Sequence, residues 1–483
     1  MKIVRTAISL TLATALVACG GNGSISDGGG GSDAPPTSGT PTPAPAPAPT
    51  PTAGCSLSER QDFAFQEINQ FYLFPDLLDT NANPAAFGTV QGYIDALVAP
   101  ARAQSKDRFF TYITSIEEEE AFFNSGSSAG FGVRLGYDTA ANRVFVLEAY
   151  EGAPALAAGI DRGTELLAIN GQSVADLMAS GGPQAVVNAL GASDAGVTRT
   201  LQYRNAAGTV TTMNVTKTEF ELDPVSNRYG AKIINDGGKK VGYLNLRTFI
   251  GPAEDDLLAA FNDFRAQGVT EMIVDFRYNG GGFIFIADLM GDLMGRDKVG
   301  QVFSNTVFRP SLASNNSTER FESLPQAIAA TKIAFIGRGG TASASELVTN
   351  SFIPYLGNNM ALVGTNTFGK PVGQIARDKE SCDDRLRIVA LKTTNANNQG
   401  EYFTGLASVV PRTCQADDDI FTQLGEPGEA SIARSLDFLA GRACTPIAST
   451  RGGTTTARTV QDRRELLQPR QPTAAQREVP GLF

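Results

Sequence analysis

The chain has 483 residues, a formal net charge of −10 at pH 7 and no histidine. The absence of histidine removes the usual general base of serine hydrolases and the usual ligands of zinc, haem iron and non-haem iron, so we expect no metal and no other cofactor. The acidic balance argues against the phosphate backbone as a main partner, so we expect no nucleic acid.

The first residues have the features of an export signal. A basic start, Met1 to Arg5, precedes an apolar run from Thr6 to Val17 that is too short to cross a bilayer comfortably. The run ends in Leu-Val-Ala-Cys19, which resembles a bacterial lipobox, and the resemblance implies that residues 1–18 are removed and that Cys19 is lipidated. Gly20 after the cysteine favours the outer membrane. We therefore expect a lipoprotein of the bacterial cell envelope that contacts the membrane through its lipid anchor alone; a chance Ala-Cys after an ordinary signal peptide is the alternative.

Two regions have compositions that do not favour a packed core. Residues 19–54 are rich in Gly and Ser and then in Thr-Pro and Ala-Pro repeats, which predicts an extended tether. Residues 445–483 are rich in Thr, Arg, Gln and Pro without periodicity, which predicts a mostly disordered low-complexity tail. The region between them is long enough for two or three folded domains.

Four cysteines follow Cys19 in the chain: Cys55, Cys382, Cys414 and Cys444. An even number in an oxidising compartment indicates two disulfides, and three pairings are possible. We favour Cys382 with Cys414 and Cys55 with Cys444, because the second bridge would join the two ends of the folded region.

The first part of the folded region is predicted to be helical. Apolar residues recur at helical spacing from Ser58 to Leu78, and a second helix is expected near Val90 to Ala99. These helices predict a small N-terminal domain over residues 55–115.

A glycine-rich turn and a set of short strands follow. Gly130, Phe131, Gly132 and Val133 precede a strand at Arg143–Leu147, a short helix from Ala155 and a tight turn at Asn170-Gly171. This order resembles a PDZ domain over residues 128–220. The glycines would let amide groups converge on a carboxylate, and the next strand could pair with an extended peptide, so residues 130–133 are predicted to bind a peptide C-terminus. A plain turn that leads into a strand is the alternative for these four residues.

Strands and helices alternate through the remaining domain, residues 225–444. The predicted strands are Val241–Leu246, Met272–Phe276, Ile333–Gly337 and Met360–Val363, and the predicted helices are Pro252–Ala266, Phe283–Met294 and Ser343–Phe352. Repeated strand-loop-helix units predict an α/β fold with parallel-type pairing, whose reactive loops lie at the ends of strands.

Three motifs lie in these loops. They are Val-Asp-Phe-Arg-Tyr-Asn-Gly-Gly-Gly at 274–282, Thr-Ala-Ser-Ala-Ser-Glu at 341–346, and Thr-Phe-Gly-Lys at 367–370 with Gln374. Together with the PDZ-like run they resemble the carboxyl-terminal processing proteases, also called tail-specific proteases, which are serine endopeptidases with a Ser-Lys dyad. The resemblance covers about Ser58 to Pro411, and it implies protein or peptide substrates with free C-termini.

The resemblance assigns a role to each of three residues. Ser343 is the expected nucleophile, Lys370 the expected general base, and Gln374 the residue that orients the lysine. Desolvation can lower the pKa of a buried lysine by up to roughly 3 to 5 units, and Phe368 could provide the apolar wall. The Gln374 amide can accept a hydrogen bond from the lysine without adding a negative charge that would retain its proton.

The same resemblance predicts an oxyanion hole. Ser343 is expected at the start of a helix, where backbone amides point outward and can stabilise negative charge. We assign the hole to the amide of Ala344 and to one amide of the 280–282 loop, for which we take Gly281.

Several alternatives stay open. Ser345 precedes Lys370 by 25 residues, the separation usual in the family, whereas Ser343 precedes it by 27. Residues 343–346 also form a helix capping box. A catalytically inactive PDZ-containing scaffold lipoprotein is the rival function. A penicillin-binding type of enzyme is disfavoured, because the chain contains no Ser-x-x-Lys.

Overall fold

The computed structural model describes residues 53–448 and 464–483. The predicted signal peptide, the lipidation site Cys19 and the tether as far as residue 52 lie outside the described residues, so these stay predictions. Among the helices of the two described ranges, none is both long enough and apolar enough to cross a bilayer.

A six-stranded sheet forms the base of the region that contains the three motifs. Its strand order is β10 (Ala231–Asp236), β11 (Lys239–Asn245), β12 (Glu271–Asp275), β15 (Lys332–Gly337), β16 (Met360–Gly364) and β19 (Thr413–Gln415). β10 pairs antiparallel with β11, and every other neighbouring pair is parallel. The predicted alternation of strand and helix, and the α/β class, are confirmed.

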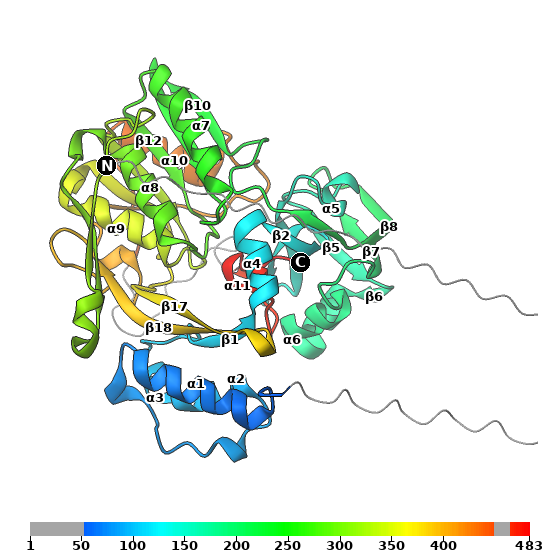
Figure 1. Cartoon of the computed structure of the whole chain (residues 1–483). Helices are drawn as coiled ribbons and strands as arrows, with labels where there is room; N and C mark the ends of the chain where they lie inside the picture. Colours follow the sequence, from blue (N-terminus) through cyan, green and yellow to red (C-terminus); the bar gives the residue numbers. More distant parts are fainter. Residues whose placement is uncertain (1–52, 449–463) are drawn as a thin grey trace, which may run out of the picture. The chain divides into compact units, whose positions relative to one another are not determined.

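Helices cover both faces of this sheet (Figure 1). α7 (Ala253–Ala266), α8 (Ile284–Met294) and α9 (Ala344–Leu356) share one hydrophobic cluster, and α10 (Ala430–Leu439) belongs to a second. In β12, Met272 and Val274 pack in the first cluster and Ile273 in the second, because successive side chains of a strand point to opposite faces. Because β12, β15 and β16 are parallel, the loops that follow them meet at one edge of the sheet.

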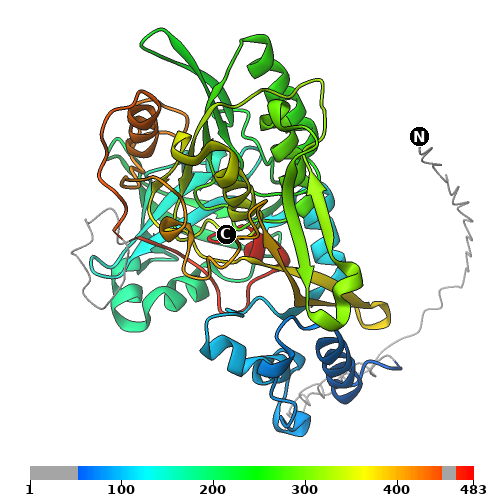
Figure 2. The ribbon, with the colours of Figure 1, turned by 90° about the vertical axis from the view of Figure 1, so that its left-hand side faces the viewer.

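A five-stranded sheet lies beside the lysine loop. It contains β1 (Tyr112–Ser115), β13 (Val302–Phe308), β14 (Ser317–Arg320), β17 (Val372–Lys379) and β18 (Asp384–Thr394), and all its pairings are antiparallel. The loop after β13 approaches the N-terminal helices (Figure 2), where Arg309 donates to the carbonyl of Asn69 at 3.1 Å. The sequence did not predict this sheet, because its strands are far apart in the chain.

The predicted N-terminal helices are present. They are α1 (Leu57–Phe71), α2 (Val90–Leu97) and α3 (Ala99–Ala103), with short 3-10 turns at Pro75–Leu77 and Pro84–Ala86. Ile68 and Ile94 pack with Leu386 and Val389 of β18 in one cluster. The helices therefore support the sheet that carries Gln374. Further 3-10 turns lie at Arg296–Lys298, Pro310–Asn315, Gly357–Asn359, Glu380–Cys382 and Leu406–Ser408.

The region expected to resemble a PDZ domain contributes most strands of a third, seven-stranded sheet. Its members are β3 (Val133–Asp138), β4 (Arg143–Ala149), β5 (Glu165–Ile169), β6 (Gln172–Ser173), β7 (Thr198–Arg204), β8 (Val210–Thr216) and β20 (Glu465–Leu466), with helices α5 (Pro154–Ala157) and α6 (Val174–Leu190). Asn170 and Gly171 both have positive φ, as the predicted tight turn requires. β2 (Ser127–Gly130) pairs with β9 (Thr218–Glu221) at the two ends of this region, after α4 (Ile116–Ser125).

The predicted disulfide pairing is wrong. The structure joins Cys55 to Cys382 and Cys414 to Cys444, with Cα atoms 5.5 and 5.3 Å apart. Cys55 lies just before α1 and Cys382 just before β18, and these two elements pack together. Cys414 lies in β19, and Cys444 follows α10, which packs on the same sheet. The pairing follows from these tertiary contacts, which the cysteine spacing does not contain.

The prediction of a disordered C-terminal region is wrong for residues 464–483, which we call the tail. The tail contains β20 and α11 (Ala474–Glu478). Its apolar side chains Leu467, Val479, Leu482 and Phe483 are buried. These side chains pack against other parts of the chain. The sequence of the tail therefore shows no helical or strand periodicity that would predict its ordered structure.

Candidate active site

Ser343 lies at the turn between the loop after β15 and the start of α9. Its φ of 56° and ψ of −116° are unusual for a residue with a side chain, and such strain is typical of functional turns. Ser343 lines a cavity of about 310 Å³ together with Ala344, Lys370 and Gln374. The structure therefore brings the three predicted catalytic residues to one cavity.

Ser345 has a different environment. Its side chain is fully buried, and its hydroxyl donates to the carbonyl of Asn279 at 3.2 Å. It does not line the cavity that Ser343 and Lys370 share. This geometry favours Ser343 over Ser345 as the nucleophile, although the spacing to Lys370 favoured Ser345.

Lys370 lies beside Gln374 and under an aromatic ring. Its Nζ donates to Oε1 of Gln374 at 2.6 Å and lies 4.8 Å from the ring centroid of Phe110. Burial lowers the pKa of Lys370, while the carboxylate of Glu478 acts in the opposite direction. The side chain is thus held by a neutral amide in surroundings that favour its neutral form.

The aromatic residue that contacts Lys370 differs from the prediction, which named Phe368. Phe110 contacts Lys370, and Phe368 packs behind Phe110 at 5.8 Å between ring centroids. The carbonyl of Phe110 also accepts a hydrogen bond from Nε2 of Gln374. Phe110 therefore both desolvates the lysine and orients its partner.

Sequence reasoning missed Phe110 and its anchor Asp107. The buried Asp107 carboxylate accepts from the amide of Phe110 at 2.8 Å, from Oγ1 of Thr111 at 2.6 Å and from the hydroxyl of Tyr72 at 2.9 Å. An aspartate whose side chain bonds the amide three residues later is a common turn signal. That signal predicts a local turn, and it does not predict contact with a lysine more than 250 residues away.

Glu346 joins the serine turn to the lysine loop. Its buried carboxylate accepts from the amides of Gly369 and Lys370, both at 2.7 Å, from Oγ1 of Thr367 at 2.6 Å and from the amide of Ser343 at 3.2 Å. Burial raises the pKa of Glu346, and these hydrogen bonds oppose the rise. The residue thus does more than cap α9, because it sets where Lys370 lies relative to Ser343.

Replacement of Glu346 by glutamine is expected to destabilise the protein. The new amide group would face donors, and each buried donor left unpaired costs roughly 1 to 3 kcal/mol. We expect the free energy of unfolding, measured by urea titration, to fall by about 3 kcal/mol. Glu401→Gln is the control, since Glu401 is exposed, and it should change this free energy by less than about 0.5 kcal/mol. Equal stability of the two variants would contradict the role of Glu346.

The predicted oxyanion hole is partly engaged in this conformation. A Cβ on Gly281 would lie 2.6 Å from Cβ of Ser343, so only glycine fits there. The Gly281 amide, however, donates to Oδ1 of Asn279 at 2.9 Å. Gly282 lines the cavity with Ser343 and Ala344, so its amide is a second candidate for the hole.

The predicted peptide-binding residues surround the last residue of the chain. The amides of Gly132 and Val133 donate to the main-chain oxygen of Phe483 at 2.9 and 3.1 Å, and Phe483 donates back to the carbonyl of Val133 at 2.9 Å. Gly132 has a φ of 74°, and a Cβ on it would clash with Ala153. Phe131 is buried in the core of this sheet, and Gly130 leaves space for the backbone of Phe483.

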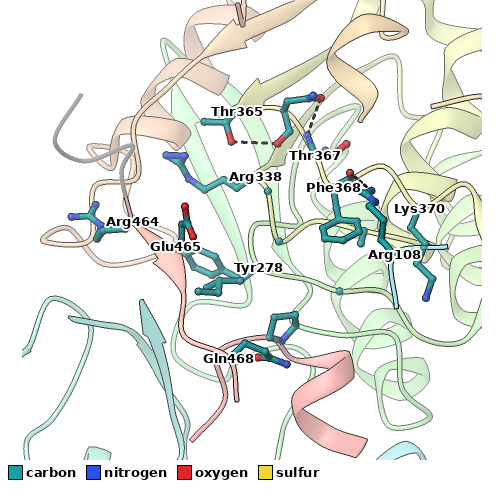
Figure 3. A pocket seen from close by; sticks show the side chains of 18 of the residues that line it. Arg108, Tyr278, Arg338, Thr365, Thr367, Phe368, Lys370, Arg464, Glu465 and Gln468 are labelled. Atoms are coloured by element: carbon teal, nitrogen blue, oxygen red, sulfur yellow. Dashed lines mark hydrogen bonds between the residues drawn. The ribbon is translucent and has the colours of Figure 1, made fainter. Parts of the chain in front are cut away.

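A larger cavity of about 900 Å³ adjoins the same loops and also reaches Lys370. Figure 3 shows Arg108, Phe368 and Lys370 on one side of it, and Glu465 and Gln468 of the tail on another. Within the described residues, no group of three or more cysteine, aspartate or glutamate side chains is arranged to hold a metal ion.

Comparison with known proteins gives a family for the central region. Residues 240–405 match the family described as Peptidase family S41. This segment is similar to that family. It contains Ser343, Lys370 and Gln374, and it does not extend to residues 130–133.

Two relatives and one solved structure show how far the similarity extends. The chain is 28% identical over 250 residues to the carboxyl-terminal-processing protease of Picosynechococcus. The aligned region covers 51% of this chain and 55% of that relative. It is 26% identical over 355 residues to the chloroplastic carboxyl-terminal-processing peptidase 3 of Arabidopsis thaliana. This aligned region covers 72% of this chain and 64% of that relative. The chain thus spans about half to two thirds of the length of these two relatives.

The fold is similar to that of a solved protein from Bacteroides fragilis that is described as an S41 protease. The two superpose with a TM-score of 0.62 at 24% identity, over 78% of this chain and 97% of the other. This likeness concerns the fold.

Proposed function

We propose that the protein is a serine endopeptidase that cleaves peptide bonds through an acyl-enzyme, with Ser343 as nucleophile and Lys370 as general base. The observation that carries this proposal is the cavity that Ser343, Lys370 and Gln374 share. A lysine whose pKa is lowered by burial can act as a base where histidine is absent.

The reaction follows from these positions. Neutral Lys370 takes the proton of the Ser343 hydroxyl while Oγ attacks the carbonyl carbon of the scissile bond. The amide of Ala344 and an amide of the Gly281–Gly282 turn stabilise the resulting oxyanion. Lys370 then gives its proton to the leaving amine, and the acyl-enzyme forms. Water, deprotonated by the same lysine, releases the acid and restores the serine.

We propose that the substrates are protein tails with free C-termini. The edge of β3 can pair with an extended peptide, and the amides of Gly132 and Val133 can donate to its last main-chain oxygens. We refer to residues 130–133 and the edge of β3 that faces away from β4 as the peptide groove. The names of the two processing proteases reported above agree with this substrate class.

Hydrolysis of an unfolded protein with an apolar C-terminus tests the proposed function. We expect cleavage, and we expect amidation of the substrate C-terminus to weaken its use, because amidation removes the charge that the groove amides would bind. The measurement is kcat/KM for matched peptides that end in a carboxylate or an amide. Absence of cleavage would contradict the protease, and equal kcat/KM values would contradict recognition of the carboxylate.

A further inference from the structure

The tail occupies the peptide groove along most of its length. β20 pairs antiparallel with β3, Glu465 opposite Tyr137 and Leu466 opposite Gly136. Leu482 lies opposite Arg134 in the same antiparallel sense. Between these two contacts, Leu135 accepts from the amide of Leu467 at 2.9 Å and donates to the carbonyl of Gly481 at 2.8 Å. Residues 465–467 and 481–483 thus form one edge strand, interrupted by a loop of residues 468–480.

Phe483 fills the end of the groove. Its backbone makes the three hydrogen bonds with Gly132 and Val133 described above, and its side chain is only 2% exposed. The ring belongs to the hydrophobic cluster that includes Val133 and Val187 of α6. A second peptide cannot bind these groups while Phe483 is in place.

The loop of residues 468–480 reaches the catalytic cavity. The main-chain oxygen of Glu478 and the ring of Pro480 lie so close to Gly280 that a Cβ there would be 2.8 and 3.2 Å from them. Glu478 lines the same cavity as Ser343 and Lys370. Glu478 and Pro480 also line the larger cavity. The loop therefore forms part of the wall of the cavity that contains the serine.

Specific contacts hold this loop in place. Nε2 of Gln476 donates to the carbonyl of Leu482 at 2.8 Å, and Gln468 both donates to the carbonyl of Gln476 at 2.6 Å and accepts from the amide of Gly481 at 3.0 Å. Val479 packs in a cluster of aromatic residues that includes Phe122 of α4; Figure 1 shows α11 beside α4. The loop has its own hydrogen-bonded structure and packs as part of the fold.

The tail also brings the carboxyl group of Glu478 to the general base. Lys370 faces the carboxylates of Glu478, Asp107 and Glu346 and the guanidinium of Arg387. The carboxylate of Glu478 comes from the tail, and it favours the charged form of the lysine, which cannot accept a proton. The position of the loop in the cavity and the effect of Glu478 on the pKa of Lys370 both disfavour reaction at Ser343.

We propose that the tail is an intramolecular ligand of the peptide groove, which closes the Ser343-Lys370 cavity until an external peptide displaces it. The displacing partner is an extended chain that ends in an apolar residue, because the groove buries the ring of Phe483 and its amides donate to a main-chain oxygen there. The occupancy of the groove follows from the contacts of the tail with β3. The regulation of catalysis also depends on the proposed protease function.

A binding experiment tests occupancy without any need for catalysis. The probe is a fluorescent peptide with the sequence of residues 477–483, Arg-Glu-Val-Pro-Gly-Leu-Phe, and the protein is the full chain with Ser343→Ala. A tethered ligand competes at an effective concentration of about 1 mM, so release of the tail by Phe483→Asp should tighten probe binding by at least about 10-fold. Arg470→Ala is the control, since Arg470 is exposed in the same segment, and it should leave the affinity unchanged. Equal affinities for the two variants, or no binding to either, would overturn the proposal.

A rate experiment tests the closure. With Ser343 intact, we expect Phe483→Asp to raise hydrolysis of an unfolded protein by about 10-fold at low substrate concentration, because the open fraction of the enzyme increases. Phe483→Ala serves as a milder variant if Phe483→Asp does not fold, as judged by its melting curve. An unchanged or lower rate would overturn the closure. If no variant hydrolyses any substrate, the proposed function and the closure both fail, and the binding experiment still decides occupancy of the groove.

Discussion

Replacement of Ser343 by alanine is expected to lower kcat for peptide hydrolysis by at least about 10³-fold. The hydroxyl of Ser343 is the group that forms the acyl bond, so its loss removes the covalent route altogether. The structure should be unaffected, because alanine occupies less space in the same cavity. The measurement is kcat with a saturating peptide, together with a melting curve to show that the variant is folded.

Ser345→Ala is the matched control for this prediction. The Ser345 hydroxyl donates to the carbonyl of Asn279 inside the protein, away from the cavity. Its removal should cost about 1 kcal/mol of stability and leave kcat within a few-fold of the original value. Loss of activity in Ser345→Ala with retention in Ser343→Ala would reverse the assignment, as the spacing to Lys370 first suggested.

Replacement of Lys370 by methionine is expected to lower kcat by a similar factor. Methionine fills much of the same volume but cannot take the serine proton, and the chain has no histidine to replace it. Lys240→Met is the control, because Lys240 also donates to a glutamine side chain, Gln267, but on the surface. Activity in Lys370→Met close to that of Lys240→Met would exclude Lys370 as the base.

The pH dependence of the rate tests the same lysine. The rate should rise with pH as Lys370 loses its proton, with a midpoint below the ordinary pKa of lysine, because burial lowers the pKa of this residue. The Glu478 carboxylate raises that pKa, so Glu478→Gln should move the midpoint to lower pH. A midpoint that does not move, or that moves to higher pH, would contradict the contact between the tail and the base.

Local sequence patterns predicted most of the α/β core, and the resemblance of its motifs to a protease family implied the three main site residues. The predicted alternation of strands and helices placed β11, β12, β15 and β16 and their helices within a few residues of their observed bounds. Ser343 and Lys370 follow two neighbouring parallel strands, β15 and β16. Because the loops after such strands meet at one edge of the sheet, sequence order alone was enough to bring the pair together.

The parts that sequence did not predict depend on contacts between distant segments. Phe110 reaches Gln374 across 264 residues, and Glu478 reaches Lys370 from the far end of the chain. The disulfide partners follow the packing of α1 on β18 and of α10 on the main sheet. The tail gains its order only from the groove and the cavity that it fills, so its composition resembled that of a disordered segment.

The central claim is that Ser343 acts as a nucleophile that Lys370 activates. Its most direct test is reaction of the protein with a fluorophosphonate, followed by peptide mapping by mass spectrometry. The account predicts one phosphonyl adduct, on the peptide segment that contains Ser343 and at that residue, absent in Ser343→Ala and formed far more slowly in Lys370→Met. An adduct at Ser345, or equal labelling rates in Lys370→Met and the unaltered protein, would contradict the account.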